Sequence, residues 1–88
     1  MFYVYVLKSK DSGKPYIGFA LDLRKRIKEH NDGKVFSTQN RLPVELIYYE
    51  AYADRKIANK RERQLKGGNA HIALMKRLGV KKVKSEIN

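Results

Sequence analysis

The sequence predicts an α+β domain whose elements follow the order β-β-α-β-α-α. Two short runs of aromatic and β-branched residues, 2–7 and 16–19, flank a turn-rich segment and indicate a hairpin. A third run with strand composition, 44–49, lies between segments whose apolar residues recur at helical spacing. The 88 residues, of which 42% are hydrophobic, suffice for one small core but not for two domains.

The predicted hairpin rests on its turn and on the alternation of its first strand. Residues 10–15 read Lys-Asp-Ser-Gly-Lys-Pro, a composition that is typical of turns. Successive side chains of a strand point to opposite faces, so Tyr3 and Tyr5 lie on the face opposite Val4. We therefore expect one face of the sheet to pack against a core.

The first helix is predicted over about ten residues, from its cap and its apolar face. Asp22 fits the N-cap position, and Gly33 lies just beyond the end of the helix. Leu23 and Ile27 are spaced i, i+4 and therefore share one face. Residues 34–43, which follow, show no periodicity and have the composition of a loop.

Two further helices are predicted in the second half of the chain. Asp54 caps the first of these, which ends at Gly67-Gly68. Asn69 caps the second, which ends before Gly79. Their apolar stripes consist of Ile57, Ala58 and Leu65 in the first and Leu74, Met75 and Leu78 in the second.

The charge of the chain points to a polyanionic partner. Lys and Arg number 20 against 9 Asp and Glu, which gives a formal net charge of +11. Because a polyanion relieves self-repulsion on this scale, nucleic acid is the leading candidate. An anionic membrane surface is the competing explanation, but residues 54–88, which carry most of the charge, contain no aromatic residue that an interfacial helix would insert.

Several classes of protein are excluded or disfavoured by what the sequence lacks. Without cysteine there is no disulfide, thiolate nucleophile or zinc finger. The apolar start is too short for a signal peptide and no run reaches the ~18 residues of a membrane span, so we expect a cytoplasmic protein. No P-loop, GxGxxG or HExxH pattern is present. We expect residues 1–80 to form one domain and residues 81–88 to form a basic C-terminal tail.

The tyrosines are the first candidate functional residues. Six tyrosines and no tryptophan in 88 residues are an unusual use of aromatic side chains. One interpretation is that Tyr3 and Tyr5 cover the face of the sheet opposite the core, which composition alone favours. The other is that a phenol held near a cation accepts a proton or orients a water for attack on phosphorus.

Arg26 and His30 form a second candidate group on the first predicted helix. They are spaced i, i+4, so they share a side and can converge on one ligand. A guanidinium suits phosphate oxygens, and a histidine can accept a proton or a hydrogen bond. The alternative is an ordinary solvated basic face, because Arg24, Lys25 and Lys28 surround them.

Glu62 is the only carboxylate between residues 55 and 85, a stretch with eleven Lys and Arg. It lies near the edge of the apolar stripe of its helix. A single carboxylate in a cationic surface can hold one Mg²⁺ together with waters and substrate phosphate oxygens. The alternative is an i, i+4 ion pair with Lys66, and the residues alone do not separate the two interpretations.

A recognisable pattern joins these residues. Tyr3-Val4-Tyr5 is followed, after ten residues, by Tyr16-Ile17-Gly18, and then by the helix that carries Arg26 and His30. This pattern resembles the GIY-YIG endonuclease superfamily, and in particular its small standalone members. The similarity continues through residues 43–50 and 61–67, and it covers roughly residues 2–78.

The resemblance implies a fold and an activity. The expected fold is a three-stranded antiparallel sheet flanked by helices. The expected activity is a metal-dependent endonuclease, with one Mg²⁺ or Mn²⁺ ion, that hydrolyses phosphodiester bonds of nucleic acid. DNA is expected more than RNA, in repair or recombination, with selection by the shape of the substrate because no recognition domain is present. A protein partner that supplies specificity is compatible with the size of the chain.

The resemblance also assigns roles to individual residues. Tyr5 and Tyr16 match the tyrosines of the two tripeptides, which position or deprotonate the attacking water. Arg26 matches the arginine that stabilises the phosphorane-like charge, and His30 matches a position from which proton transfer is assisted. Glu62 matches the carboxylate that binds the metal.

Further residues are expected to support the site. A side chain at Gly18 would crowd the approach of the backbone to the site. Arg24, Lys28, Lys60 and Lys66 are expected to contact nucleic-acid phosphates. The alternative function, in a different class, is a catalytically inactive nucleic-acid-binding module of the same fold. Metal dependence of cleavage separates the two.

Overall fold

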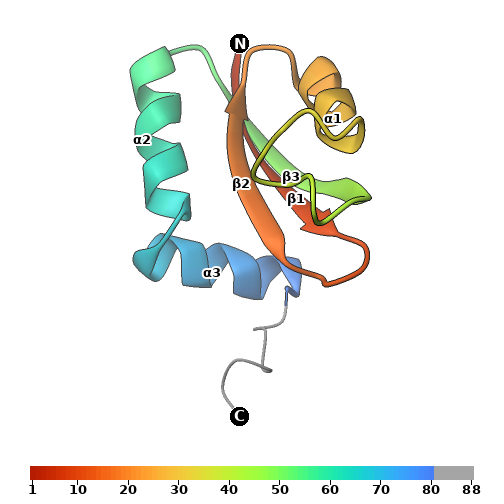
Figure 1. Cartoon of the computed structure of the whole chain (residues 1–88). Helices are drawn as coiled ribbons and strands as arrows, with labels where there is room; N and C mark the ends of the chain where they lie inside the picture. The colour runs from red at the N-terminus through yellow and green to blue at the C-terminus, as the bar shows by residue number, and fades with distance from the viewer. Residues whose placement is uncertain (81–88) are drawn as a thin grey trace.

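The computed structural model describes residues 1–80, so the predicted tail at 81–88 lies outside the described residues. Its elements follow the predicted order (Figure 1). They are β1 (Phe2–Ser9), β2 (Pro15–Ala20), α1 (Leu23–Asn31), β3 (Val44–Tyr52), α2 (Arg55–Leu65) and α3 (Gly68–Leu78). Within residues 1–80, no helix has the length and apolar character that crossing a bilayer requires.

The three strands form one antiparallel sheet in the order β2-β1-β3, as expected. β1 is therefore the central strand, and its residues from Tyr3 to Lys8 have partners in both flanking strands. Tyr5 pairs with Gly18 of β2 and with Tyr49 of β3. The pairing with β3 shifts by one residue between Val6 and Leu7. The register places the central tyrosine beside a glycine on one flank.

The helices cover the two faces of the sheet separately (Figure 1). On one face, Val4 and Val6 of β1 pack with Ala58 and Leu65 of α2 and with apolar residues of α3. On the other face, Tyr5 belongs to a cluster that includes apolar residues of α1. The predicted alternation of β1 is confirmed, and the tyrosine face turns out to be covered by a helix.

The N-caps explain where α1 and α2 begin. The Asp22 carboxylate accepts a hydrogen bond from the Lys25 backbone N–H at 3.1 Å, and the Asp54 carboxylate accepts one from the Lys56 N–H at 2.8 Å. Each aspartate satisfies a backbone donor that the first turn of a helix leaves free. The predicted cap at Asn69 is wrong. α3 begins at Gly68 after Gly67, and no side chain caps it.

Two other expectations differ from the structure. Ile57 was expected in the buried stripe of α2, but its side chain is 53% exposed. Adjacent helical residues lie about 100° apart, so Ile57 points away when Ala58 faces the sheet. β3 also extends to Tyr52, beyond the predicted end at 49, because its last residues pair with the start of β1.

An ion pair anchors α2 to β3. Arg61 of α2 donates two hydrogen bonds to the Glu50 carboxylate, at 2.8 and 3.0 Å. The Tyr48 and Tyr52 hydroxyls donate to the same carboxylate. Burial by itself raises the pKa of Glu50, but the hydrogen bonds from Arg61 and the two tyrosines outweigh it and lower the pKa to about 2. The pair fixes the helix that carries Glu62.

Candidate active site

Three aromatic side chains from three different elements meet on the α1 side of the sheet. Tyr5 comes from β1, Tyr16 from β2 and His30 from α1. The ring centroid of His30 lies 5.1 Å from that of Tyr16 and 5.8 Å from that of Tyr5, and the two tyrosine rings are 6.4 Å apart. The fold therefore brings together three residues that are widely separated in the sequence.

Hydrogen bonds extend this cluster into the loop after α1. The Tyr5 hydroxyl lies 2.8 Å from His30 Nε2, and the Thr38 hydroxyl lies 2.7 Å from His30 Nδ1. Tyr5 is 1% exposed, and His30 and Thr38 are fully buried. A solvated basic face is therefore excluded for His30. Thr38 was not among the sequence-based candidates, because the loop around it has no periodic pattern.

The pKa shifts indicate which groups carry protons in this buried cluster. Burial raises the pKa of the Tyr5 phenol to about 12, and the nearby Arg26 guanidinium only partly opposes it. Burial, helped by the positive charge of Arg26, lowers the pKa of His30. At neutral pH the phenol is therefore protonated and the imidazole is neutral.

The direction of the hydrogen bonds follows from these protonation states. A buried Tyr5 hydroxyl needs an acceptor, and a guanidinium has donors only, so the acceptor is His30 Nε2. The proton of a neutral imidazole then lies on Nδ1 and is donated to the Thr38 oxygen. The Thr38 hydroxyl in turn has the Val35 carbonyl within 3.5 Å as its acceptor.

Gly18 makes room for the Tyr5 ring. A Cβ atom at this position would lie 2.3 Å from Tyr5 Cζ and 2.4 Å from its hydroxyl oxygen. Such a contact is impossible without displacing the ring. The sequence predicts that a side chain at Gly18 would crowd the approach of the backbone to the site. The structure gives a more specific reason, because such a side chain would clash with the Tyr5 ring. The absence of a side chain at Gly18 leaves the space beside β2 that the Tyr5 ring occupies.

Arg26 lies beside Tyr5 with part of its side chain in solvent. Its guanidinium pairs with Glu29 at 3.1 Å, and the side chain as a whole is 39% exposed. Burial tends to lower the pKa of Arg26, but the hydrogen bonds with Glu29 and Tyr5 raise it above its ordinary value. The expectation that Arg26 and His30 share a side is confirmed, since both act on the Tyr5 phenol. A permanent positive charge thus faces the tyrosine cluster.

Glu62 belongs to α2, which packs on the face of the sheet opposite to α1. Its charge is one of the causes that raise the pKa of Tyr5, although the smallest of them. Its carboxylate also forms the alternative ion pair, with Lys66 Nζ at 3.0 Å, and the side chain is 20% exposed. The ion pair is present, and the carboxylate is still accessible from solvent.

The donor set around Glu62 decides what kind of metal ion would fit. Among residues 1–80 no group of three or more His, Cys, Asp or Glu side chains is arranged to hold an ion. A protein cage for Zn²⁺ or Ca²⁺ is therefore not found in this part of the chain. One accessible carboxylate does fit Mg²⁺, which keeps several waters and completes its shell with substrate phosphate oxygens.

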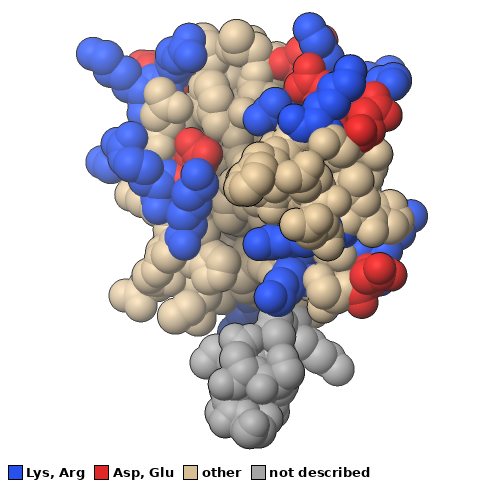
Figure 2. Space-filling model, viewed as in Figure 1, with Lys and Arg blue, Asp and Glu red and all other residues tan. Residues whose placement is uncertain are grey.

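The four basic candidates differ in their surroundings. Arg24 and Lys60 are exposed on α1 and α2. Lys28 is paired with Asp32 at 2.8 Å, and Lys66 is paired with Glu62. Figure 2 shows Lys and Arg side chains gathered over α1 and α2 on the viewed face, with a strip of uncharged residues between them. The aromatic cluster thus lies on a sheet whose flanking helices carry positive charge.

Comparison with known proteins identifies the fold and the family. A family model described as the GIY-YIG catalytic domain matches residues 1–76. A UPF0213 protein of Staphylococcus saprophyticus is 43% identical over 65 residues, which cover 73% of this chain and 78% of the relative. A UPF0213 protein of Streptococcus pneumoniae is 45% identical over 65 residues, covering 73% of this chain and 65% of the relative.

A solved structure gives the same result. The solution NMR structure of a UPF0213 protein from Bacillus halodurans superposes with a TM-score of 0.54 and 29% sequence identity. The superposition covers 99% of this chain and 95% of the other. The chain therefore belongs to the GIY-YIG catalytic domain family, a nuclease superfamily.

Proposed function

We propose that this protein is a metal-dependent endonuclease that hydrolyses phosphodiester bonds of nucleic acid. The observation that carries the proposal is the convergence of Tyr5, Tyr16 and His30 beside the partly exposed Arg26 guanidinium. Membership of a nuclease superfamily supports it. In this proposal residues 1–80 are the nuclease unit.

Arg26 binds the scissile phosphate and opposes the charge that develops in the transition state. Its raised pKa keeps it charged at any pH at which the enzyme works. A fixed guanidinium that faces the reacting phosphate stabilises developing negative charge without costly reorganisation. The ion pair with Glu29 holds the side chain in place while leaving more than a third of it open to substrate.

The aromatic cluster positions the attacking water and accepts its proton. Tyr16 is only half-buried, so it is the phenol that holds the water. The water gives its proton to the Tyr5 oxygen as Tyr5 passes its own proton to His30 Nε2, 2.8 Å away. The water becomes hydroxide, Tyr5 is unchanged and His30 becomes an imidazolium. Thr38 accepts the Nδ1–H of this imidazolium.

Glu62 would hold one Mg²⁺ or Mn²⁺ ion through its accessible carboxylate. When bound, the ion supplies Lewis-acid stabilisation of charge on the phosphate oxygens. Lys66 forms an ion pair with Glu62 in this structure. If Glu62 holds a metal ion instead, Lys66 can contact a neighbouring phosphate. The ion pair thus keeps the carboxylate neutralised until substrate arrives.

We propose DNA rather than RNA as the substrate, recognised by its structure and not by its sequence. The positive charge over α1 and α2 gives affinity that does not depend on base sequence. A partner protein that supplies target choice is compatible with this arrangement.

The decisive experiment is cleavage of labelled duplex, single-stranded, flap and four-way-branched DNA and RNA with Mg²⁺, Mn²⁺ or EDTA. Glu62→Gln is compared with Lys66→Gln, because both changes break the same ion pair. We expect the two variants to unfold at similar temperatures. Only Glu62→Gln should abolish turnover, whereas Lys66→Gln should weaken binding and keep cleavage at saturating substrate.

The second candidate function is a catalytically inactive binding module. The Glu62–Lys66 ion pair favours it, because a carboxylate with a structural partner need not bind metal. Equal retardation of every substrate, with no cleavage under any metal, would replace the nuclease proposal by this one.

A further inference from the structure

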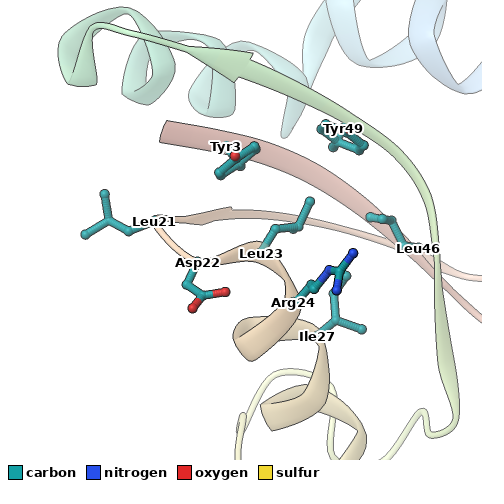
Figure 3. A pocket seen from close by; sticks show the side chains of 8 residues that line it. All are labelled: Tyr3, Leu21, Asp22, Leu23, Arg24, Ile27, Leu46 and Tyr49. Atoms are coloured by element: carbon teal, nitrogen blue, oxygen red, sulfur yellow. The ribbon is translucent and has the colours of Figure 1, made fainter. Parts of the chain in front are cut away.

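A second concave surface lies on the same face of the sheet as Tyr5. It is an open hollow of about 570 Å³ between β1, β3 and the N-terminal half of α1. Figure 3 shows Tyr3 and Tyr49 on its strand side and Leu23 and Ile27 on its helix side. The lining is mostly apolar, and only Arg24 among these residues is already a candidate contact for nucleic-acid phosphates.

The aromatic lining of the hollow is open to solvent. Tyr49 is 53% exposed, and Leu21 at the rim is 59% exposed. The rings of Tyr3 and Tyr49 meet edge to face, with centroids 6.0 Å apart and an angle of 64°. In this arrangement one ring supports the other and leaves aromatic surface available for a ligand.

The charge at the rim indicates the chemistry of the ligand. Arg24 lines the hollow and is exposed. The nearby Asp22 carboxylate is engaged as the N-cap of α1, where it accepts from the Lys25 N–H. An aromatic surface beside an exposed guanidinium suits a flat ring that carries a phosphate, which is a nucleotide. The net charge of +11 favours the same anionic polymer over an apolar peptide.

Helix α1 links the hollow to the candidate active site. Leu23 and Ile27 face the hollow, whereas Arg26 and His30 on the same helix act on Tyr5. Tyr49 is also the direct neighbour of Tyr5 in the sheet. A helix is about 10 Å across. A nucleic-acid strand whose phosphate is bound at Arg26 therefore reaches the hollow within a few nucleotides.

We propose that this hollow binds an unpaired nucleobase of the substrate, a few nucleotides from the scissile phosphate, and so selects substrates that are single-stranded beside the cut. The inference rests on the proposed function, because it deepens the choice of substrate. A base in a duplex is stacked and paired on both sides, and it can enter the hollow only after it is unpaired. The base stacks on Tyr49, and Arg24 contacts its phosphate.

The test is a binding measurement in EDTA, so that it does not depend on cleavage. Fluorescence anisotropy measures the affinity of the wild type and of three variants, Tyr49→Leu, Tyr49→Phe and Phe36→Leu. Each protein is titrated against short single-stranded DNA, single-stranded RNA and the matching duplexes. Phe36 is the matched control, because it is 86% exposed and lies outside the hollow. We expect Tyr49→Leu to weaken single-strand binding about tenfold and duplex binding less than about twofold. Tyr49→Phe and Phe36→Leu should change neither.

A scan with single abasic sites locates the base. The affinity of the wild type should fall when the abasic site is at one position of the oligonucleotide. The affinity of Tyr49→Leu should not depend on the position of the abasic site. An equal effect of Tyr49→Leu on duplex and single strand, or no effect on either, overturns the proposal. Comparison of the affinities for single-stranded DNA and single-stranded RNA shows whether the hollow prefers a deoxyribonucleotide or a ribonucleotide. If no substrate is cut but the Tyr49 effect persists, the nuclease proposal fails and the nucleobase site stands.

Discussion

Thr38 shows how a single buried hydroxyl defines the chemistry of its neighbours. Its oxygen accepts from His30 Nδ1, which leaves Nε2 as the acceptor for the Tyr5 hydroxyl. The Tyr5 hydroxyl, which needs Nε2 as its acceptor, favours the same tautomer, and Thr38 strengthens that preference by accepting the Nδ1–H. A hydrogen bond on one imidazole nitrogen commonly fixes the proton of the other in this way.

Thr38→Val should therefore loosen the tautomer of His30. The ¹⁵N chemical shifts of the imidazole nitrogens report the tautomer of each histidine. The sequence contains only two histidines, so the signals of His30 are easily assigned. His71 is a built-in reference, since its Nδ1 lies 2.7 Å from the Leu65 carbonyl and must carry the proton. We expect both histidines to be protonated on Nδ1 in the wild type, and only His30 to change in Thr38→Val.

Thr38→Ser is the control for this experiment, because it restores the hydroxyl. It should keep the wild-type NMR pattern, and its turnover should be about tenfold higher than that of Thr38→Val at equal KM. A proton on His30 Nε2 in the wild type would contradict the proposed direction of the hydrogen bonds.

At the scale of elements, the Glu50–Arg61 pair decides how α2 sits on the sheet. The Glu50 side chain is 13% exposed, and Arg61 donates to both of its oxygens. Breaking one partner of such a pair leaves the other charge poorly compensated. Because Glu62 follows Arg61 directly in α2, the anchor also fixes the position of the proposed metal ligand.

Glu50→Gln should lower the free energy of unfolding by about 2 kcal/mol, which corresponds to a fall in Tm of about 10 °C. Glu45→Gln is the control, because Glu45 is exposed on the same strand, and its effect should stay within about 0.5 kcal/mol. Thermal unfolding followed by circular dichroism measures both. Equal effects of the two changes would show that the pair adds no stability.

The same carboxylate makes stability depend on acid pH. The pKa of Glu50 is about 2 in the folded protein against an ordinary value of 4.5, so protonation favours the unfolded state. Its contribution is complete above pH 4.5 and is lost as the pH falls toward 2. We expect the Tm of Glu50→Gln to fall less steeply than that of the wild type across this range.

At the scale of the whole molecule, charge distribution governs affinity. The net charge of +11 predicts binding that weakens steeply as salt rises, because each phosphate contact releases counterions. The four basic candidates are not equivalent, however. Lys60 is exposed, whereas Lys28 already has Asp32 at 2.8 Å as a partner. A lysine with an internal partner gains less from a phosphate.

Lys60→Ala should weaken DNA binding to a similar extent for all base sequences, and it should reduce the slope of log affinity against log salt by about 1. Lys28→Ala should have a smaller effect on both. Anisotropy titrations between low and moderate salt measure the slopes. A loss with Lys60→Ala that depends on base sequence would contradict a pure phosphate contact.

The sequence by itself determined the features that depend on near neighbours. Periodicity assigned the faces of β1, and the aspartates at 22 and 54 marked where α1 and α2 begin. The spacing of Tyr5, Tyr16 and Gly18 indicated the family. These features are readable because strand alternation and helix capping involve residues within a few positions of each other.

The tertiary structure alone decided which distant groups meet. It turned Ile57 outward, joined Thr38 to His30, and paired Glu50 with Arg61. It also opened the hollow beside Tyr49. Each of these depends on how a loop is folded or how a helix is rotated against the sheet. Such packing is set by contacts between segments far apart in the chain, and no local pattern of residues encodes them.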